Sequence, residues 1–347
     1  MKQILPLLLI LQFLAIQVFA GNPDRQGEAG AYELLMNPWA RSAGLHTLST
    51  SMVMGVEALQ LNVAGICRIN RTELLAGHSI YLQGVDITTN AFGLAQRVGK
   101  NGAFGVSITG LDFGEIRETT TNQPEGTGAT FSPSFFSLGL SYAHLFENKV
   151  SVGITVRGIS ESISDVSSFG FALDAGVQYV TGEQDNFKFG ISLRSVGSRM
   201  TFRGEGLSVN GPSPNDGGYN LTYDQRTATF ELPSLLNIGG SYDFRFDPKN
   251  RLTIVGNFTA NSFSRDEIGA GLEYSLSELF MLRGGYRYEL GVENEAEASV
   301  YKGLSAGVSV EAPLSKENKN TRLGIDYAYR QTRIWNGTHN ISVRISI

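Results

Sequence analysis

The sequence predicts an all-β fold, a closed antiparallel barrel of fourteen strands that lies in a membrane and holds an N-terminal hatch segment in its lumen. Three observations lead to this prediction. Apolar and polar residues alternate with a period of two along most of the chain, and the connections between these segments alternate between short and long. In addition, no stretch after residue 20 holds the roughly 18 apolar residues that a membrane-spanning helix needs.

Residues 1–20 have the features of a secretory signal peptide. Lys2 supplies a positive charge, residues 4–19 are almost continuously apolar, and Ala20 is a small residue before the expected cleavage site at Gly21. An uncleaved membrane anchor is the alternative, but the apolar run is short and no stop-transfer sequence follows it. No cysteine follows the cleavage site, which argues against a lipoprotein.

Residues 21–70 do not alternate and precede the first predicted strand, so we assign them to a hatch or plug folded into the barrel lumen. The alternative is a disordered periplasmic tail. Apolar residues such as Leu45 and Leu59 make the segment too hydrophobic for a solvated tail. We single out Trp39, Arg41 and Asn62 as hatch residues, and we expect the segment to start in the periplasm.

Residues 71–347 should form the transmembrane β-barrel. The alternating segments lie near 73–84, 87–98, 102–114, 132–146, 149–160, 167–180, 187–202, 228–246, 251–262, 266–276, 280–290, 298–312, 321–332 and 339–347. A single-chain outer-membrane barrel has an even number of strands, and most segments reach the roughly nine to eleven residues that a tilted strand needs to cross a bilayer.

The connections supply an independent test of the barrel. The turns after even-numbered strands, which we place in the periplasm, are short and span 99–102, 147–149, 181–186 and 247–250. The two longest connections, residues 115–131 and 203–227, follow odd-numbered strands and fall on the outer side. Outer-membrane barrels show this asymmetry, whereas a water-soluble all-β protein, the alternative fold, has no reason to produce it.

The last nine residues should form the strand that closes the barrel. Ile341, Val343, Ile345 and Ile347 share one face, and Arg344 lies on the other. Since an unpaired edge strand this apolar would aggregate in water, we expect its apolar face on lipid, Arg344 in the lumen, and the first and thirteenth strands as neighbours.

Composition excludes several classes of function. Charged residues make up 18% of the chain, the net charge is −5, and no block of Lys and Arg is present, so nucleic acid is not an expected partner. The 41 glycines suit a crowded barrel interior. Cys67 is the only cysteine, which excludes an internal disulfide, and we expect it to be a small buried hydrophobe.

We predict no enzyme, cofactor or metal site. Gly303-Leu-Ser305-Ala-Gly307 fits the nucleophile-elbow pattern, but it lies within an alternating strand and we interpret it as a chance match. The four histidines are scattered, and no His or Cys pair has the spacing of metal ligands. An outer-membrane hydrolase would need a contact between a serine and a histidine that the sequence does not place.

Polar residues that should face the lumen are the first of two regions that could carry function. They are Asp174, Gln178, Arg194, Arg330 and Arg344. We interpret them as a structural network beneath the hatch; a solvated interior is the alternative.

The longest outer loop is the second region, because loops of this length on a rigid barrel commonly bind partners. Its candidate partner-binding residues are Arg203, Glu205, Tyr219, Tyr223 and Arg226. The many glycines and prolines of the loop also fit simple mobility.

Several segments resemble a known family. The stretch Asn37-Pro-Trp-Ala-Arg41-Ser-Ala-Gly44 and the later Asn62-Val-Ala-Gly65-Ile66 are similar to the hatch of PorV/PorQ-type proteins of the Bacteroidetes, which are relatives of the FadL long-chain fatty acid transporters. Segments 169–176, 187–192 and 231–239 resemble the body of the same family, so the likeness covers essentially the whole mature chain. The family commonly has proline where this chain has Val63, and an acidic pair is reduced to Glu57, which leaves the subgroup open.

The resemblance implies an outer-membrane protein of a Gram-negative bacterium with a role in type IX secretion. PorV-like barrels bind the C-terminal signal domains of secreted cargo at the outer face, and PorQ-like barrels belong to the surface-attachment complex. The expected partners are therefore cargo signal domains, secretion components and outer-membrane lipid. A FadL-like channel for hydrophobic small molecules is the alternative, and it requires an apolar tunnel past the hatch.

Overall fold

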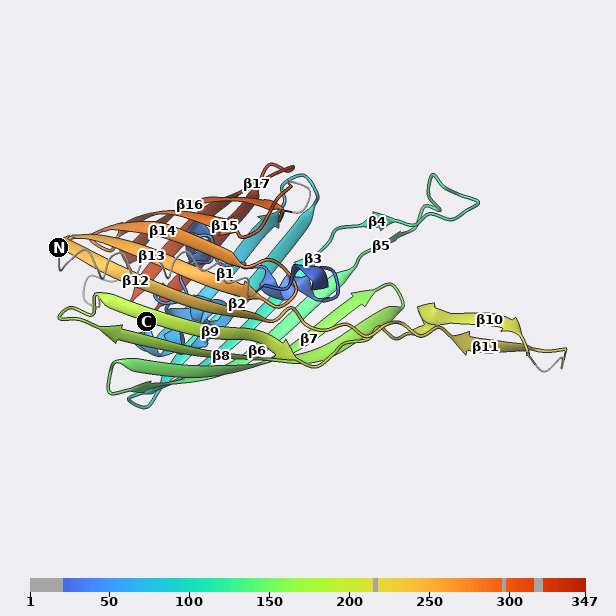
Figure 1. The fold of residues 1–347 in the computed structure, drawn as a ribbon, viewed down its shortest axis with the longest axis horizontal. Helices are drawn as coiled ribbons and strands as arrows, with labels where there is room; N and C mark the ends of the chain where they lie inside the picture. Colours follow the sequence, from blue (N-terminus) through green and yellow to red (C-terminus); the bar gives the residue numbers. More distant parts are fainter. Residues whose placement is uncertain (1–20, 215–217, 295–297, 315–320) are drawn as a thin grey trace, which may run out of the picture.

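The computed structural model describes residues 21–214, 218–294, 298–314 and 321–347. Fourteen antiparallel strands form one closed barrel, which confirms the predicted fold (Figure 1). In chain order the barrel strands are β1 (Thr72–Tyr81), β2 (Ile87–Val98), β3 (Gly102–Asp112), β6 (Ser134–Phe146), β7 (Val150–Ile163), β8 (Val166–Thr181), β9 (Phe187–Gly197), β12 (Leu235–Asp247), β13 (Asn250–Asn261), β14 (Glu267–Leu276), β15 (Phe280–Glu289), β16 (Tyr301–Pro313), β17 (Arg322–Thr332) and β18 (Thr338–Ser346).

The alternation of the sequence separates an apolar outer wall from a polar inner wall. In β8, Phe169 and Phe171 are exposed on the outside, while Ser168 and Asp174 are buried on the inside. This band of exposed apolar side chains is the surface that a barrel presents to lipid. Among the residues described, no helix is long and apolar enough to cross a membrane.

The seam between the first and last strands forms as the sequence predicts. β18 pairs with β1 on one side and with β17 on the other. Ile341 and Val343 are exposed on the outer wall, and Arg344 is buried in the lumen. The carboxyl-terminal strand therefore leaves no free edge.

The connections define two ends of the barrel. At the short-turn end, residues 99–101, 147–149 and 182–186 join consecutive strands. At the long-loop end, residues 113–133 and 198–234 extend far beyond the wall (Figure 1). By the rule for outer-membrane barrels, the long-loop end faces the outside of the cell.

Both long loops contain small sheets that the alternation did not predict. β4 (Ile116–Arg117) pairs with β5 (Thr130–Phe131), and β10 (Ser208–Pro212) pairs with β11 (Asn220–Asp224). The short η5 helix (Glu205–Leu207) precedes β10. Figure 1 shows the β10–β11 hairpin projecting away from the barrel.

The predicted extension of two strands into the longest loop is wrong. We expected strands over 187–202 and 228–246, but β9 ends at Gly197 and β12 begins at Leu235. Between them, Met200 and Leu232 turn inward and are buried in a cluster with Leu34 of the N-terminal segment. These apolar residues therefore form a cap over the lumen and do not extend the barrel strands. The backbone of Met200 pairs with that of Phe230 in an isolated bridge.

The N-terminal segment runs through the lumen from the long-loop end to the short-turn end. Its helical turns are η1 (Pro23–Arg25), η2 (Tyr32–Leu35), α2 (Ala40–Gly44), η3 (Gly55–Glu57), α3 (Ala58–Leu61) and η4 (Val63–Arg68). Gly21 contacts Asp266 at the long-loop end, whereas Arg68 bonds the carbonyl of Lys149 at the short-turn end. The expected periplasmic start of the segment is thus reversed, because these contacts place its first residues at the outer end.

Candidate functional site

Wall glycines form the seat on which the N-terminal segment rests. At each of them, a Cβ atom would come closer to the segment than ordinary van der Waals contact allows. These glycines, each with the segment residue that it faces, are Gly77 (Trp39), Gly93 (Val56), Gly105 (Leu59), Gly153 (Val63), Gly176 (Asn62), Gly190 (Thr50), Gly269 (Leu48), Gly285 (Leu45) and Gly307 (Gly44). They occur around the barrel, so the plug touches the wall on every side.

Trp39 and Asn62 fix the segment in this seat. The Trp39 side chain is 1% exposed and packs against Gly77 of β1. The Asn62 side-chain nitrogen lies 3.1 Å from the carbonyl oxygen of Val177 and 3.3 Å from that of Ile191, on two neighbouring strands. The same nitrogen lies 3.0 Å from the carbonyl oxygen of Thr50, so one amide joins the wall to two parts of the segment.

Arg41, in α2 of the segment, lies in the lumen among acidic side chains of the segment and the wall. Burial alone would lower the pKa of its guanidinium, but the carboxylates of Asp326 and Glu57, with further ones on the wall, outweigh that effect and raise it. Glu57 is buried and accepts hydrogen bonds from the backbone nitrogens of Arg41 and Ser42 at 3.3 and 3.0 Å. Glu57 was not selected as a site residue from the sequence, where it was noted only as what remains of an acidic pair common in the resembling family.

Ion pairs cross the inner wall, three of them between neighbouring strands and the fourth, Arg344–Glu311, from β18 past β17 to β16. The paired atoms lie 2.8 Å apart in Arg157–Asp174, 2.6 Å in Lys188–Asp243, 2.6 Å in Arg283–Glu273 and 2.6 Å in Arg344–Glu311. Arg157 also donates to the carbonyl oxygen of Leu59, which ties the wall to the plug. A buried charge is costly without a partner, and breaking one of these pairs would leave an uncompensated charge.

The five inward polar residues selected from the sequence are all buried. Asp174 and Arg344 belong to the ion pairs, and Gln178 donates to the carbonyl oxygens of Thr50 and Val53 in the segment. Arg194 donates to the carbonyl oxygen of Leu34 at 3.1 Å. These contacts give most of the inward residues a structural role in holding the segment.

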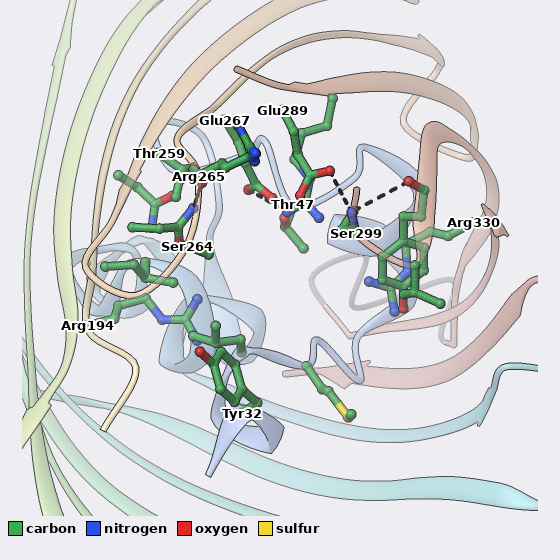
Figure 2. A pocket seen from close by; sticks show the side chains of 18 of the residues that line it. Tyr32, Thr47, Arg194, Thr259, Ser264, Arg265, Glu267, Glu289, Ser299 and Arg330 are labelled. Carbon is green, nitrogen blue, oxygen red and sulfur yellow. Dashed lines mark hydrogen bonds and ion pairs between the residues drawn. The ribbon is translucent and has the colours of Figure 1, made fainter. Parts of the chain in front are cut away.

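A cavity of about 290 Å³ lies between the segment and the wall near the long-loop end (Figure 2). Tyr32 of the segment lines it, and Figure 2 shows Arg194 and Arg330 on opposite sides. Glu267 and Glu289 also line it; Glu267 pairs with Arg287 at 3.0 Å, and Glu289 accepts from the backbone nitrogen of Ser299 at 2.7 Å. The lining mixes these charged groups with apolar side chains such as Leu35, Met36 and Leu235, and the cavity is at the small end of the range for ligand pockets.

The nucleophile-elbow string has the surroundings of a structural residue. Ser305 lies in the middle of β16, is 3% exposed and donates to the carbonyl oxygens of Gly44 and Gly285. Cys67 is a buried free thiol, and burial raises the pKa of that thiol to about 11. Within the described part of the chain, no group of three or more His, Cys, Asp and Glu side chains could hold a metal ion.

The β10–β11 hairpin has one apolar and one polar face. Val209 is opposite Tyr223, and the side chains of Val209, Tyr219, Leu221 and Tyr223 are between 39% and 55% exposed. The alternate positions carry polar cross-strand pairs, with 2.7 Å between Ser208 Oγ and Asp224 Oδ1 and 2.9 Å between Thr222 Oγ1 and Asn210 Oδ1.

The structure separates the five loop residues selected from the sequence into two groups. Tyr219 and Tyr223 lie on the apolar face of the hairpin. Arg203, Glu205 and Arg226 lie at its base, where the backbone of Arg203 bonds that of Ser167. Val209 and Leu221, which complete the apolar face, were missed because their pairing depends on the position of the turn.

Comparison with solved structures identifies the architecture. The Ralstonia pickettii toluene transporter TbuX superimposes with a TM-score of 0.57 at 13% identity, covering 89% of this chain and 97% of that chain. The Pseudomonas putida toluene transporter TodX gives 0.53 at 14% identity, with 86% and 94% covered, and a Pseudomonas aeruginosa FadL homologue gives 0.52 at 12%, with 89% and 98% covered. At such low identities the likeness shows the fold, which is that of FadL-like barrels.

Comparison with protein families identifies the relationship by descent. No curated protein matches the chain. The model of the family described as type IX secretion system membrane protein PorP/SprF matches residues 82–345, which is most of the barrel. With its lipid-facing outer wall, the protein is an outer-membrane β-barrel, and it belongs to the PorP/SprF family of type IX secretion system membrane proteins.

Proposed function

We propose that this protein is a non-enzymatic outer-membrane barrel of type IX secretion that docks the C-terminal signal domains of cargo, or surface-attachment components, through its β10–β11 hairpin. The family supplies the secretion context. The observation that carries the docking role is the hairpin itself, a ribbon with an exposed apolar face that projects from the long-loop end (Figure 1).

The physical properties of the hairpin favour a partner. A two-stranded ribbon is marginally stable alone in water, and its outer edges keep unpaired backbone groups that another strand can bond. Covering Val209, Leu221 and Tyr223 would remove a contiguous apolar strip from water, which favours association. The polar face would remain solvated in the complex.

The filled lumen agrees with docking better than with transport. The segment contacts the wall through the glycine seat, and ion pairs cross the inner wall beside it. A FadL-like channel for hydrophobic small molecules would need a continuous apolar route, whereas the cavity near the long-loop end has Arg194, Arg330 and Glu289 among its apolar lining residues. These charged groups interrupt the apolar surface and count against the alternative. The narrower likeness to PorV/PorQ proteins stays a hypothesis within the type IX secretion role.

Site-specific crosslinking tests the proposal. A photo-crosslinking residue at position 221 or 219, on the apolar face, should capture a cargo signal domain or a secretion component in native outer membranes. The same residue at position 210 or 222, on the polar face, serves as the matched control and should capture much less. Equal capture from both faces, or capture from neither while a known secretion barrel in the same membranes captures its cargo, would refute the docking role.

A pair of substitutions tests the same surface without crosslinking. Leu221→Ser with Tyr223→Ser should reduce binding of a purified signal domain by about tenfold or more, because the two side chains contribute apolar area at the centre of the strip. Asn210→Ser with Thr222→Ser should leave binding within about twofold. Exchanging one small polar side chain for another on a solvated face has little effect on the free energy. Unchanged binding in the first variant would contradict the proposal.

A further inference from the structure

Gly21 lies against a buried carboxylate at the long-loop end. Its backbone nitrogen is 2.6 Å from Oδ2 of Asp266, which belongs to the connection between β13 and β14. Asp266 is 3% exposed, and its Oδ1 accepts a hydrogen bond from the backbone nitrogen of Asn261 at 3.1 Å. The first described residue of the chain therefore meets an acidic group that is shielded from solvent.

Only glycine fits at position 21. A Cβ atom there would lie 2.7 Å from the backbone nitrogen of Asp266, 2.8 Å from its Oδ1 and 2.9 Å from the carbonyl oxygen of Ser264. The first and last of these atoms are backbone, so they cannot move aside as the tip of a flexible side chain would. The close approach of the nitrogen to the carboxylate depends on the missing side chain.

The same residue follows the cleavage site that the sequence predicts after Ala20. We propose that hydrolysis of the Ala20–Gly21 bond by a signal-removing protease turns Gly21 into the N-terminal ammonium of the mature chain, and that this ammonium forms an ion pair with Asp266. Water supplies a hydroxyl group to the carbonyl carbon of Ala20 and a hydrogen to the nitrogen of Gly21. The released amine takes a further proton at neutral pH, because α-amino groups titrate near about 7.7–8.0.

An ammonium at Gly21 would strengthen the contact with Asp266, because an ion pair adds Coulombic attraction to the hydrogen bond, most strongly where solvent is excluded. Nearby contacts hold the same stretch at the long-loop end. The Arg25 guanidinium lies 4.2 Å from the ring centroid of Phe263, and its Nη2 lies 3.2 Å from Glu231. The ammonium thus completes an anchor that joins the mature N-terminus to two outer loops.

The mass of the mature chain and the reactivity of its N-terminus test this inference in the full-length protein purified from outer membranes. Intact mass should show a chain that begins at Gly21. An acylating reagent selective for α-amines should label the folded wild type slowly. Asp266→Asn should speed labelling by about tenfold or more, because it removes one partner of a buried ion pair.

Two further variants keep the test decisive. Asp24→Asn, an exposed position in η1, is the matched control and should label at the wild-type rate. Gly21→Ala retains a small residue at the cleavage site, so it should be cleaved at the same bond yet label as fast as Asp266→Asn; it decides the matter if Asp266→Asn fails to fold. A mature chain that begins elsewhere, or equal labelling of wild type and Gly21→Ala, would overturn the inference. Since neither readout involves cargo, its failure would leave the docking proposal standing.

Discussion

Neighbouring glycines of β15 face opposite sides of the wall, and they show how the plug is accommodated. A Cβ atom at Gly285 would lie 2.7 Å from the carbonyl carbon of Leu45, whereas one at Gly284 would have only the carbonyl oxygen of Ser305 within reach, at 3.9 Å. We expect Gly285→Ala to destabilise the folded barrel by about 1–3 kcal/mol through overpacking. Gly284→Ala should change stability by about 0.5 kcal/mol or less.

The comparison of these two glycines is internally controlled. Both substitutions reduce the flexibility of the unfolded chain equally, so that effect cancels. The measurement is the urea concentration at which each barrel loses its heat-modifiable mobility in electrophoresis. If the two variants lost their heat-modifiable mobility at the same urea concentration, Leu45 would not be in close contact with the wall at Gly285.

We expect His46 to make the seating of the plug depend on pH. Its ring is 0% exposed, stacks edge-on against Tyr301 at 5.5 Å, and makes no hydrogen bond to any described residue through either ring nitrogen. Burial, with Arg287 and Arg330 nearby, holds the pKa of His46 well below its usual value of 6.5.

The sign of the pH effect follows from that lowered pKa. The seated state excludes the proton that an unseated His46 would bind, so its contribution to stability is complete above pH 6.5 and is lost as the pH falls below 6.5. Ion conductance across planar bilayers should therefore rise between about pH 7 and pH 5 in the wild type, as the loosened plug admits ions. His46→Asn, which suits the positive φ of 52° at this position, should remove most of the rise. His78→Asn, on the exposed wall, should retain it.

At the scale of single elements, the β10–β11 hairpin is separable from the barrel. Its cross-strand hydrogen bonds, such as Ser208–Asp224 and Tyr223–Pro212, run within the hairpin. The inward cluster that includes Met200 and Leu232 lies closer to the barrel and caps the lumen. The hairpin therefore contributes little to the stability of the wall.

Replacing residues 208–224 with a short Gly-Ser linker should abolish binding of a signal domain while heat-modifiable mobility remains unchanged. Exposed loop tips tolerate such replacement because few contacts are lost. The matched control replaces residues 118–127 of the other long loop, between β4 and β5, and should retain binding. If replacing residues 118–127 abolished binding while replacing residues 208–224 did not, the docking surface would lie on the loop between β4 and β5 and the proposal would be wrong.

At the scale of the whole molecule, the closed seam between β1 and β18 bears on whether the barrel must open in order to bind a partner. β1 and β18 pair from Glu73–Ser346 to Ile80–His339, so the wall is continuous. A docking role at the long-loop end does not require the strands to separate. It predicts that locking the seam leaves binding intact.

A disulfide across the seam tests this prediction. Ala76 and Val343 are paired across β1 and β18. Because Cys67 is the only native cysteine and is buried, Ala76→Cys with Val343→Cys gives a clean pair. The oxidised variant should bind a signal domain within about twofold of the reduced one, as expected for a change distant from the hairpin. Loss of binding on oxidation that a reductant restores would show instead that the barrel opens at this seam.

The sequence by itself determined the wall of the barrel. Alternation is a local property, since successive side chains of a strand point to opposite faces, so the fourteen strands, the inward Arg344 and the closing strand could all be predicted from short windows. The lengths of the connections likewise distinguished the short-turn end of the barrel from the long-loop end. Trp39 and Asn62 could be selected as lumen residues because their segment is too apolar for solvent.

Only the tertiary structure decided what fills the barrel and what projects from it. The direction in which residues 21–70 cross the lumen depends on contacts such as Gly21–Asp266, which join residues 245 positions apart. Glu57, the glycine seat and the inward turn of Met200 likewise depend on which distant side chains come to lie opposite them. A period of two fixes the face on which a residue lies, but the partner on that face is set by packing, which no local pattern encodes.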